Sequence, residues 1–123
     1  MHKETIYRGI RDRRGCHVEV VSTGGHVEAL QHLNHHHPGL SYQWGSGRHP
    51  RTADLSLSIL ADAIAANTKG TNMTGIYSRA MRLSIPFEWV LRSSVGWMDN
   101  WEITRREVLD WVHDHEPMVS KVA

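Results

Sequence analysis

Apolar and polar residues alternate along much of the chain between residues 4 and 44. Alternation at a period of two places one face of a strand against a core and the other toward solvent. It predicts strands over residues 4–9 and 16–21, a strand or a short helix over 26–33, and a strand through Tyr42-Gln43-Trp44. Glycine-containing turns at 11–15 and 22–25 separate the first three segments. We therefore expect an N-terminal antiparallel sheet of three to four strands.

The pattern changes to helical spacing after residue 50. Leu55, Ile59, Leu60 and Ala63 recur at intervals of mostly three and four, with more apolar residues beside them. A helix buried on more than one side is expected from this pattern, because its apolar surface is wider than a single stripe. Thr52 is its predicted N-terminal cap, since a threonine hydroxyl can accept from the free N–H groups of the first turn.

A second helical region follows a polar linker. Gly70 can stop the first helix, and Thr71 or Asn72 can start the next, which is expected to run to about Leu83. A break is expected at residues 84–87, because proline interrupts a helix. After it, residues 87–92 fit a short helix or a strand, and residues 93–100 fit a loop.

The last helix carries the clearest start signal in the chain. Thr104-Arg105-Arg106-Glu107 has the form of a capping box, and apolar residues follow it at helical spacing. Pro117 is expected to end this helix, leaving a frayed tail from about residue 117. Together the elements predict one α+β domain over residues 1–123, in which the sheet packs against two to four helices.

Composition excludes several classes of protein. No segment approaches the length of a membrane span, so no membrane partner is expected. The N-terminal residues are polar and charged, without the apolar stretch of a secretory signal. Cys16 is the single cysteine, so no internal disulfide can form, which fits a reducing compartment. A net charge of +1 argues against an acidic mimic of DNA. We therefore expect a cytoplasmic protein.

Several short motifs resemble those of a family of small uncharacterised proteins from phages, plasmids and bacterial genomes. That family has an early Tyr-Arg-Gly, then Phe/Tyr-x-Trp-Gly before Gly-Ser-Gly-Pro-Ala-x-Leu, and later Trp-x-Leu or Trp-x-Ile. The matching segments are Tyr7-Arg8-Gly9, Val18-Glu19-Val20, His37-Pro38-Gly39, Tyr42-Gln43-Trp44-Gly45, Ser46-Gly47, Ala53-Asp54-Leu55, Trp101-Glu102-Ile103 and Trp111. The chain departs from the pattern in its glycine loop, which carries Arg48-His49, and in a longer segment over 84–100. The resemblance favours a strand for 26–33 and implies a setting in mobile elements and their hosts.

Histidine is in excess, with ten in the chain, which raises the question of a metal site. His35, His37 and His49 are the candidate ligands, because imidazole binds zinc. Structural zinc sites commonly add cysteines, so a solvated loop is the competing interpretation. Cys16 and His17 are adjacent, but neighbours on a strand point to opposite faces and make no catalytic pair. We therefore expect no cofactor and no enzymatic activity, with a histidine-ligated metal-dependent enzyme as one alternative.

The candidate binding residues are aromatic and arginine side chains outside the predicted elements. Trp97-Met98 lies in a predicted loop, where it either forms an interaction surface or packs on the core. The other candidates are Arg48 and Arg51 beside the glycine bend, and Arg13 and Arg14 in the first turn. Arginine is enriched at protein interfaces.

These observations favour a protein that acts by binding. Small size, the lack of catalytic spacing and the resemblance to mobile-element proteins favour an anti-CRISPR or other anti-defence inhibitor, bound to a host protein or effector complex. The alternative is a small nucleic-acid-binding protein, in which the arginine-rich turns would contact phosphates.

Overall fold

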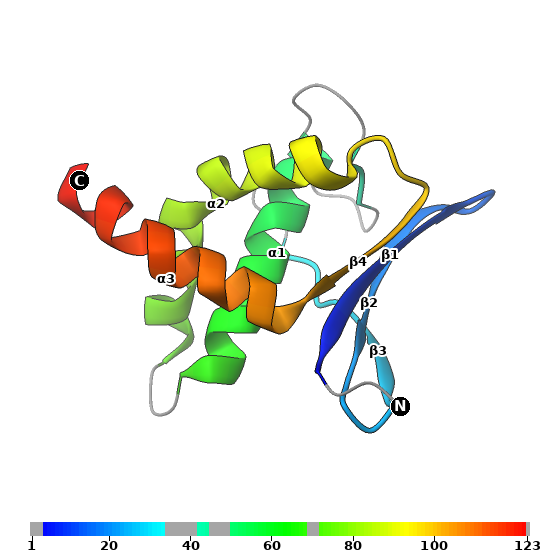
Figure 1. Cartoon of the computed structure of the whole chain (residues 1–123), viewed down its shortest axis with the longest axis horizontal. Helices are drawn as coiled ribbons and strands as arrows, with labels where there is room; N and C mark the ends of the chain where they lie inside the picture. The colour runs from blue at the N-terminus through cyan, green and yellow to red at the C-terminus, as the bar shows by residue number, and fades with distance from the viewer. Residues whose placement is uncertain (1–3, 34–41, 45–49, 69–71, 123) are drawn as a thin grey trace.

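A computed structural model describes residues 4–33, 42–44, 50–68 and 72–122 of the chain. The elements are β1 (Ile6–Asp12), β2 (Gly15–Val21), β3 (Val27–Ala29), α1 (Pro50–Asn67), α2 (Met73–Val95), β4 (Asn100–Thr104) and α3 (Arg105–Val122). The helices lie on one side of the sheet, as Figure 1 shows. The predicted α+β fold, a small antiparallel sheet against helices, is confirmed.

The strands follow the order β3-β2-β1-β4, and every neighbouring pair is antiparallel. The fourth strand was expected at Tyr42-Gln43-Trp44, and this prediction is wrong. Tyr42 makes only an isolated bridge to Cys16, whereas β4 comes from the C-terminal half of the chain and pairs with β1. The alternation of Tyr42 and Trp44 correctly indicated buried side chains, since both residues are buried. Trp44 nevertheless packs in the core without being part of a strand.

The two predicted turns join successive strands. β1 extends to Asp12, which pairs with Gly15, so Arg13 and Arg14 alone form the tip of the first hairpin. Gly15 adopts a φ of 111°, a conformation that favours glycine. In the second turn, the Gly25 N–H donates to the Ser22 carbonyl at 2.8 Å. β3 follows this turn, as the strand interpretation of residues 26–33 predicted.

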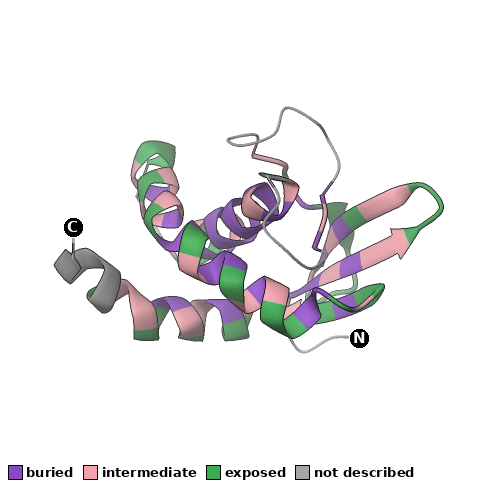
Figure 2. Cartoon of the chain, turned by 90° about the horizontal axis from the view of Figure 1, so that it is seen from above, coloured by how far each residue is buried: buried purple, intermediate pink, exposed green. Residues whose placement is uncertain are grey.

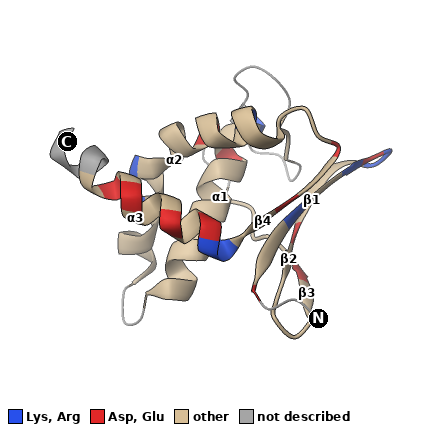
Figure 3. Cartoon of the chain, in the orientation of Figure 1, with Lys and Arg blue, Asp and Glu red and all other residues tan. Residues whose placement is uncertain are grey.

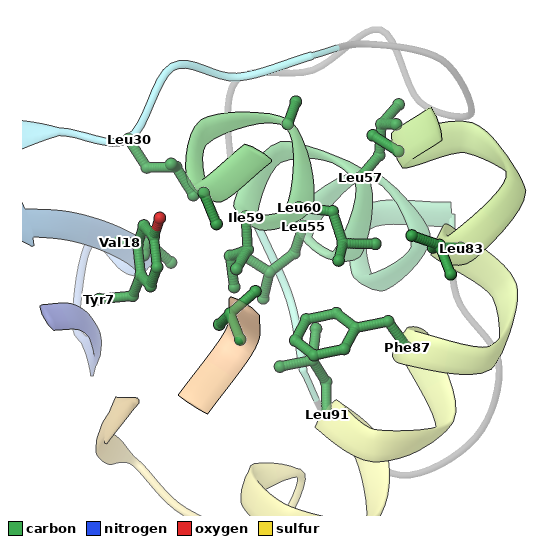
Figure 4. Packing of buried hydrophobic residues seen from close by; sticks show 14 of the residues in the cluster. Tyr7, Val18, Leu30, Leu55, Leu57, Ile59, Leu60, Leu83, Phe87 and Leu91 are labelled. Carbon is green, nitrogen blue, oxygen red and sulfur yellow. The ribbon is translucent and has the colours of Figure 1, made fainter. Parts of the chain in front are cut away.

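The core surrounds α1 and includes residues of the sheet, α2 and α3. Leu55, Leu57 and Leu60 of α1 have no exposed surface, so this helix is buried on more than one side, as predicted. Figure 2 shows this burial along the helix. Figure 4 shows side chains of α1 between Tyr7 and Val18 of the sheet on one side and Leu83 and Phe87 of α2 on the other. α1 begins at Pro50, so the prediction that Thr52 caps it is wrong. The Thr52 hydroxyl instead donates to the Gln43 carbonyl at 2.7 Å.

α2 is a single helix that contains Pro86, so the predicted break at 84–87 is wrong. Asn72 caps its start and accepts from the Gly75 N–H at 2.9 Å, as predicted. Proline removes one helical hydrogen bond and bends a helix, and the two halves of α2 run in different directions in Figure 1. The apolar face nevertheless continues through Leu83, Phe87 and Leu91, and its burial favours one continuous helix.

α3 begins at the predicted capping box. The Thr104 N–H donates to Glu107 Oε1 at 3.0 Å, and the Glu107 N–H donates to Thr104 Oγ1 at 2.9 Å. The helix continues through Pro117 to Val122, so the predicted end at Pro117 is wrong. Just before the proline, Arg79 of α2 binds both oxygens of Glu116 at 2.9 Å, which fixes that turn of α3.

A polar cluster joins the sheet to two helices. The Tyr7 hydroxyl donates to Asp62 Oδ2 at 2.7 Å, and Arg105 Nη2 donates to the same oxygen at 2.6 Å. Arg105 Nε also reaches the Tyr7 hydroxyl at 3.1 Å. Asp62, which lies on the largely buried α1, thus has two partners.

Among the described residues, no helix is both long enough and apolar enough to cross a membrane.

Candidate protein-binding surface

The predicted Trp97-Met98 pair separates into an exposed and a packed residue. The side chain of Trp97 is 74% exposed, directly after α2 ends at Val95. Met98 is half-buried and packs against the core. Packing on the core therefore describes Met98, whereas Trp97 is exposed to solvent and its role as an interaction surface stays a prediction.

The loop that carries Trp97 is fixed on both sides. The Trp44 indole donates to the Met98 carbonyl at 2.7 Å, and the Met98 N–H donates to the Val95 carbonyl at 3.0 Å. On the sheet side, the Arg11 N–H donates to the Asp99 carbonyl at 2.8 Å, and the side chains of these two residues form an ion pair at 3.3 Å. The backbone around Trp97 is therefore held before any partner binds.

The first hairpin brings arginines to the same end of the molecule. Arg13 and Arg14 are exposed at its tip, and Arg11, which pairs with Asp99 beside Trp97, lies next to that tip. Figure 3 shows the basic tip projecting beyond the rest of the sheet. Two of the predicted arginines therefore lie at the tip of the hairpin whose Arg11 pairs with Asp99.

The remaining predicted site residues are Arg51, Arg48 and three histidines. Arg51 lies in the first turn of α1 and is half-buried. Arg48 and the metal candidates His35, His37 and His49 lie outside the described residues. Across the part of the chain that the structure describes, no three His, Cys, Asp or Glu side chains gather as a metal site requires.

A second exposed tryptophan was missed by the sequence analysis. Trp89 is 61% exposed on α2, and the guanidinium carbon of Arg92 lies 4.7 Å from the centre of its ring. Ile85, one turn earlier, is exposed to the same extent. The spacing of 85, 89 and 92 is a helical stripe, but it was hidden because a break was expected at Pro86. This stripe leads along α2 toward Trp97.

A groove also lies between the C-terminal half of α2, β4 and the start of α3. Its volume is about 440 Å³, and most of its lining is apolar. The residues that line it are Phe87, Val90, Ser94, Val95, Met98, Trp101, Glu102, Ile103, Glu107, Val108 and Trp111. Figure 1 looks onto the three elements that surround it. This groove was not predicted, because no strand was expected at 100–104.

Two buried tyrosine hydroxyls near the core, those of Tyr42 and Tyr7, have hydrogen-bond partners within the fold. Burial raises the pKa of the Tyr42 phenol to about 12, and its hydroxyl donates to the Gln31 carbonyl at 3.3 Å. Burial, followed by the nearby charge of Asp62, also raises the pKa of Tyr7. Both phenols therefore stay protonated and act as donors within the fold. Cys16 is half-buried against the core.

In comparisons with protein-family models, curated proteins and solved structures, the chain matches none.

Proposed function

We propose that the protein acts by binding another protein through the surface around Trp97. The observation that carries this proposal is a largely exposed tryptophan on a backbone held by Trp44 and Arg11. Tryptophan and arginine dominate the energetics of protein interfaces, because they bury a large area and combine apolar and polar contacts. A loop already held in one conformation loses little conformational entropy on binding. The stripe of Ile85, Trp89 and Arg92 extends this surface along α2.

The test compares two exposed hydrophobic residues at opposite ends of α2. Immobilised wild type, Trp97→Ala and Met73→Ala proteins are incubated with bacterial lysates, and bound proteins are quantified by mass spectrometry. Met73 is the matched control, because it is 60% exposed but lies at the first residue of α2. We expect a partner that both wild type and Met73→Ala retain and that Trp97→Ala loses by more than tenfold. Equal recovery by Trp97→Ala would contradict the proposal.

A narrower form of this proposal is an inhibitor that occludes an anti-phage defence effector, such as a CRISPR complex. It is supported by the resemblance to proteins of phages and plasmids, and by a size suited to blocking a surface. A bacterium with an active CRISPR system, challenged by a targeted phage, should form more plaques when it expresses the wild type than when it expresses Trp97→Ala. Unchanged plaque numbers across several CRISPR types would contradict the narrower form.

One observation favours nucleic-acid binding as a second candidate. Arg13 and Arg14 are exposed at a hairpin tip on the same end of the molecule as Trp97. Cations beside an exposed aromatic ring are what single-stranded nucleic acid requires, since phosphates pair with the cations and bases stack on the ring. Salt-dependent binding of a single-stranded oligonucleotide, lost in the Arg13→Ala/Arg14→Ala double variant, would support this candidate over a protein partner.

A further inference from the structure

β4 is at one edge of the sheet that the described strands form. The sheet order is β3-β2-β1-β4, so among the described strands β4 pairs with β1 alone. Both Asn100 and Glu102 of this strand are exposed. An edge strand offers a row of backbone donors and acceptors to another extended chain.

The hydrogen-bond register shows which backbone groups face outward. The Arg11 N–H donates to the Asp99 carbonyl, and the Arg105 N–H donates to the Thr5 carbonyl, both at 2.8 Å. Hydrogen-bonded pairs alternate along an antiparallel ladder, so the intervening bonded residues of β4 are Trp101 and Ile103. The N–H and C=O groups of residues 100, 102 and 104 therefore point away from β1.

One of the outward groups already has a partner, which supports this register. The Thr104 N–H is bound by the Glu107 carboxylate in the capping box. Within the described part of the chain, no residue makes such a bond to the outward groups of Asn100 and Glu102. These two residues can therefore offer two donors and two acceptors to an added strand.

The side chains of β4 define what the added strand must carry. Trp101 shares a sheet face with Gly9, and Ile103 shares the same face with Tyr7, which points toward the helices. Trp101 and Ile103 also line the apolar groove, so residues beside them in an added strand would project into it. The side chain of Glu102 lies on the opposite face, where a directly opposed basic residue would be favourable. Of the described residues that line the groove, none is Lys or Arg.

We propose that β4 and the adjacent groove bind an extended segment of a partner protein by strand addition, with an apolar–basic–apolar pattern at three successive residues. The backbone of this segment pairs with Asn100 and Glu102, its apolar side chains enter the groove, and its basic side chain lies opposite Glu102. The inference rests on the proposed function in one respect, that the chain acts by binding protein. It assigns the partner an extended conformation and places it beside the Trp97 loop, since Met98 also lines the groove.

A library of random twelve-residue peptides displayed on phage provides the probe, and selected peptides are then synthesised. Amide exchange followed by NMR separates the two edges of β4. In the free protein the amides of Asn100 and Glu102 should exchange rapidly, while those of Trp101 and Ile103 are protected by β1. We expect a bound peptide to slow exchange at Asn100 and Glu102 by more than tenfold and to change Trp101 and Ile103 little.

Substitutions at Glu102 separate the backbone from the side chain. Glu102→Pro removes the outward N–H without removing a bond to β1, so the sheet should persist while peptide affinity falls more than tenfold. Glu102→Gln keeps the N–H and loses only the charge, so the affinity should fall two- to fivefold. Circular dichroism and thermal unfolding of both variants verify that the fold is retained.

Several results would overturn the inference. They are failure to select any peptide, protection at amides outside β4, or equal peptide affinity in wild type and Glu102→Pro. A dimer detected by light scattering and abolished by Glu102→Pro would show a second copy of the chain on this edge instead. In the lysate experiment, a partner lost by Trp97→Ala but retained by Glu102→Pro would leave the proposed function intact and remove strand addition alone.

Discussion

The indole nitrogen of Trp44 donates a hydrogen bond to the carbonyl oxygen of Met98 at 2.7 Å, although the two residues are far apart in the sequence. Trp44 has no exposed surface, whereas Trp97, the residue before Met98, is largely exposed. Arg11 also lies over the Trp44 ring, with its guanidinium carbon 5.3 Å from the ring centre. The core thus holds the backbone that presents the candidate binding residue.

Trp44→Phe should therefore destabilise the protein strongly, and Trp97→Ala should leave its stability almost unchanged. Trp44→Phe removes a buried donor, leaves the Met98 carbonyl without it and creates a cavity, so the free energy of unfolding should fall by about 2–4 kcal/mol. Trp97→Ala changes an exposed side chain and should alter this free energy by about 0.5 kcal/mol or less. Urea unfolding followed by circular dichroism measures both.

Binding should weaken in both variants, but for different reasons. Trp97→Ala removes contact area, and Trp44→Phe loosens the loop that positions that area. A Trp44→Phe protein as stable as wild type would show that the hydrogen bond to Met98 contributes little to the fold.

The second prediction concerns the close approach of β1 and β4. A side chain at Gly9 would collide with the ring of Trp101, its partner across the two strands. Gly9→Ala must displace Trp101 or separate the strands, so the free energy of unfolding should fall by more than about 2 kcal/mol. Gly24→Ala is the control, because nothing lies within 4 Å of the added carbon there. Similar unfolding midpoints for the two variants in urea would contradict the predicted collision.

The sequence predicted elements whose signals are local. The first hairpin, the strand after Gly25 and the capping box of Thr104 and Glu107 each depend on neighbouring residues, and each is present. Burial of Tyr42 and Trp44 also followed from their alternation. The pairing of β1 with β4 could not be predicted from this alternation, because it depends on contacts between residues far apart in the sequence. Pro86 and Pro117 also misled, since both lie inside helices. At Pro86, the burial of Leu83, Phe87 and Leu91 outweighs the local cost of a proline in a helix.

The candidate surface was partly predictable. Trp97 was identified from its loop, and Arg13 and Arg14 from their turn. Their position at one end of the molecule depends on the pairing of Arg11 with Asp99, which no local pattern reveals. Exposure of Trp89 was not predicted, because it depends on α2 continuing through Pro86. The groove was not predicted, because it depends on β4.

The third prediction concerns the contact of α1 with the bend in α2. The buried hydroxyl of Ser56 donates to the Ser84 carbonyl at 2.6 Å, close to Pro86. Ser56→Ala removes this donor from a site that water does not reach, so the free energy of unfolding should fall by about 1–2 kcal/mol. Ser78→Ala, at an exposed position of α2, should change it by less than about 0.5 kcal/mol. Equal values for both variants in urea unfolding would show that the bond adds no net stability.

The fourth prediction concerns stability at high pH. Burial raises the pKa of Tyr42 to about 12, whereas a tyrosine in an unfolded chain has a pKa of about 10. Between these values the folded state holds a proton that the unfolded state releases, so raising the pH favours unfolding. This stabilisation is complete below pH 10 and is lost as the pH approaches 12, with a magnitude on the order of 2–3 kcal/mol. Tyr42→Phe cannot ionise, so its free energy of unfolding should fall less steeply across this interval. Urea unfolding at several pH values measures both slopes, and parallel curves for the two proteins would show that Tyr42 ionises alike in the folded and unfolded states.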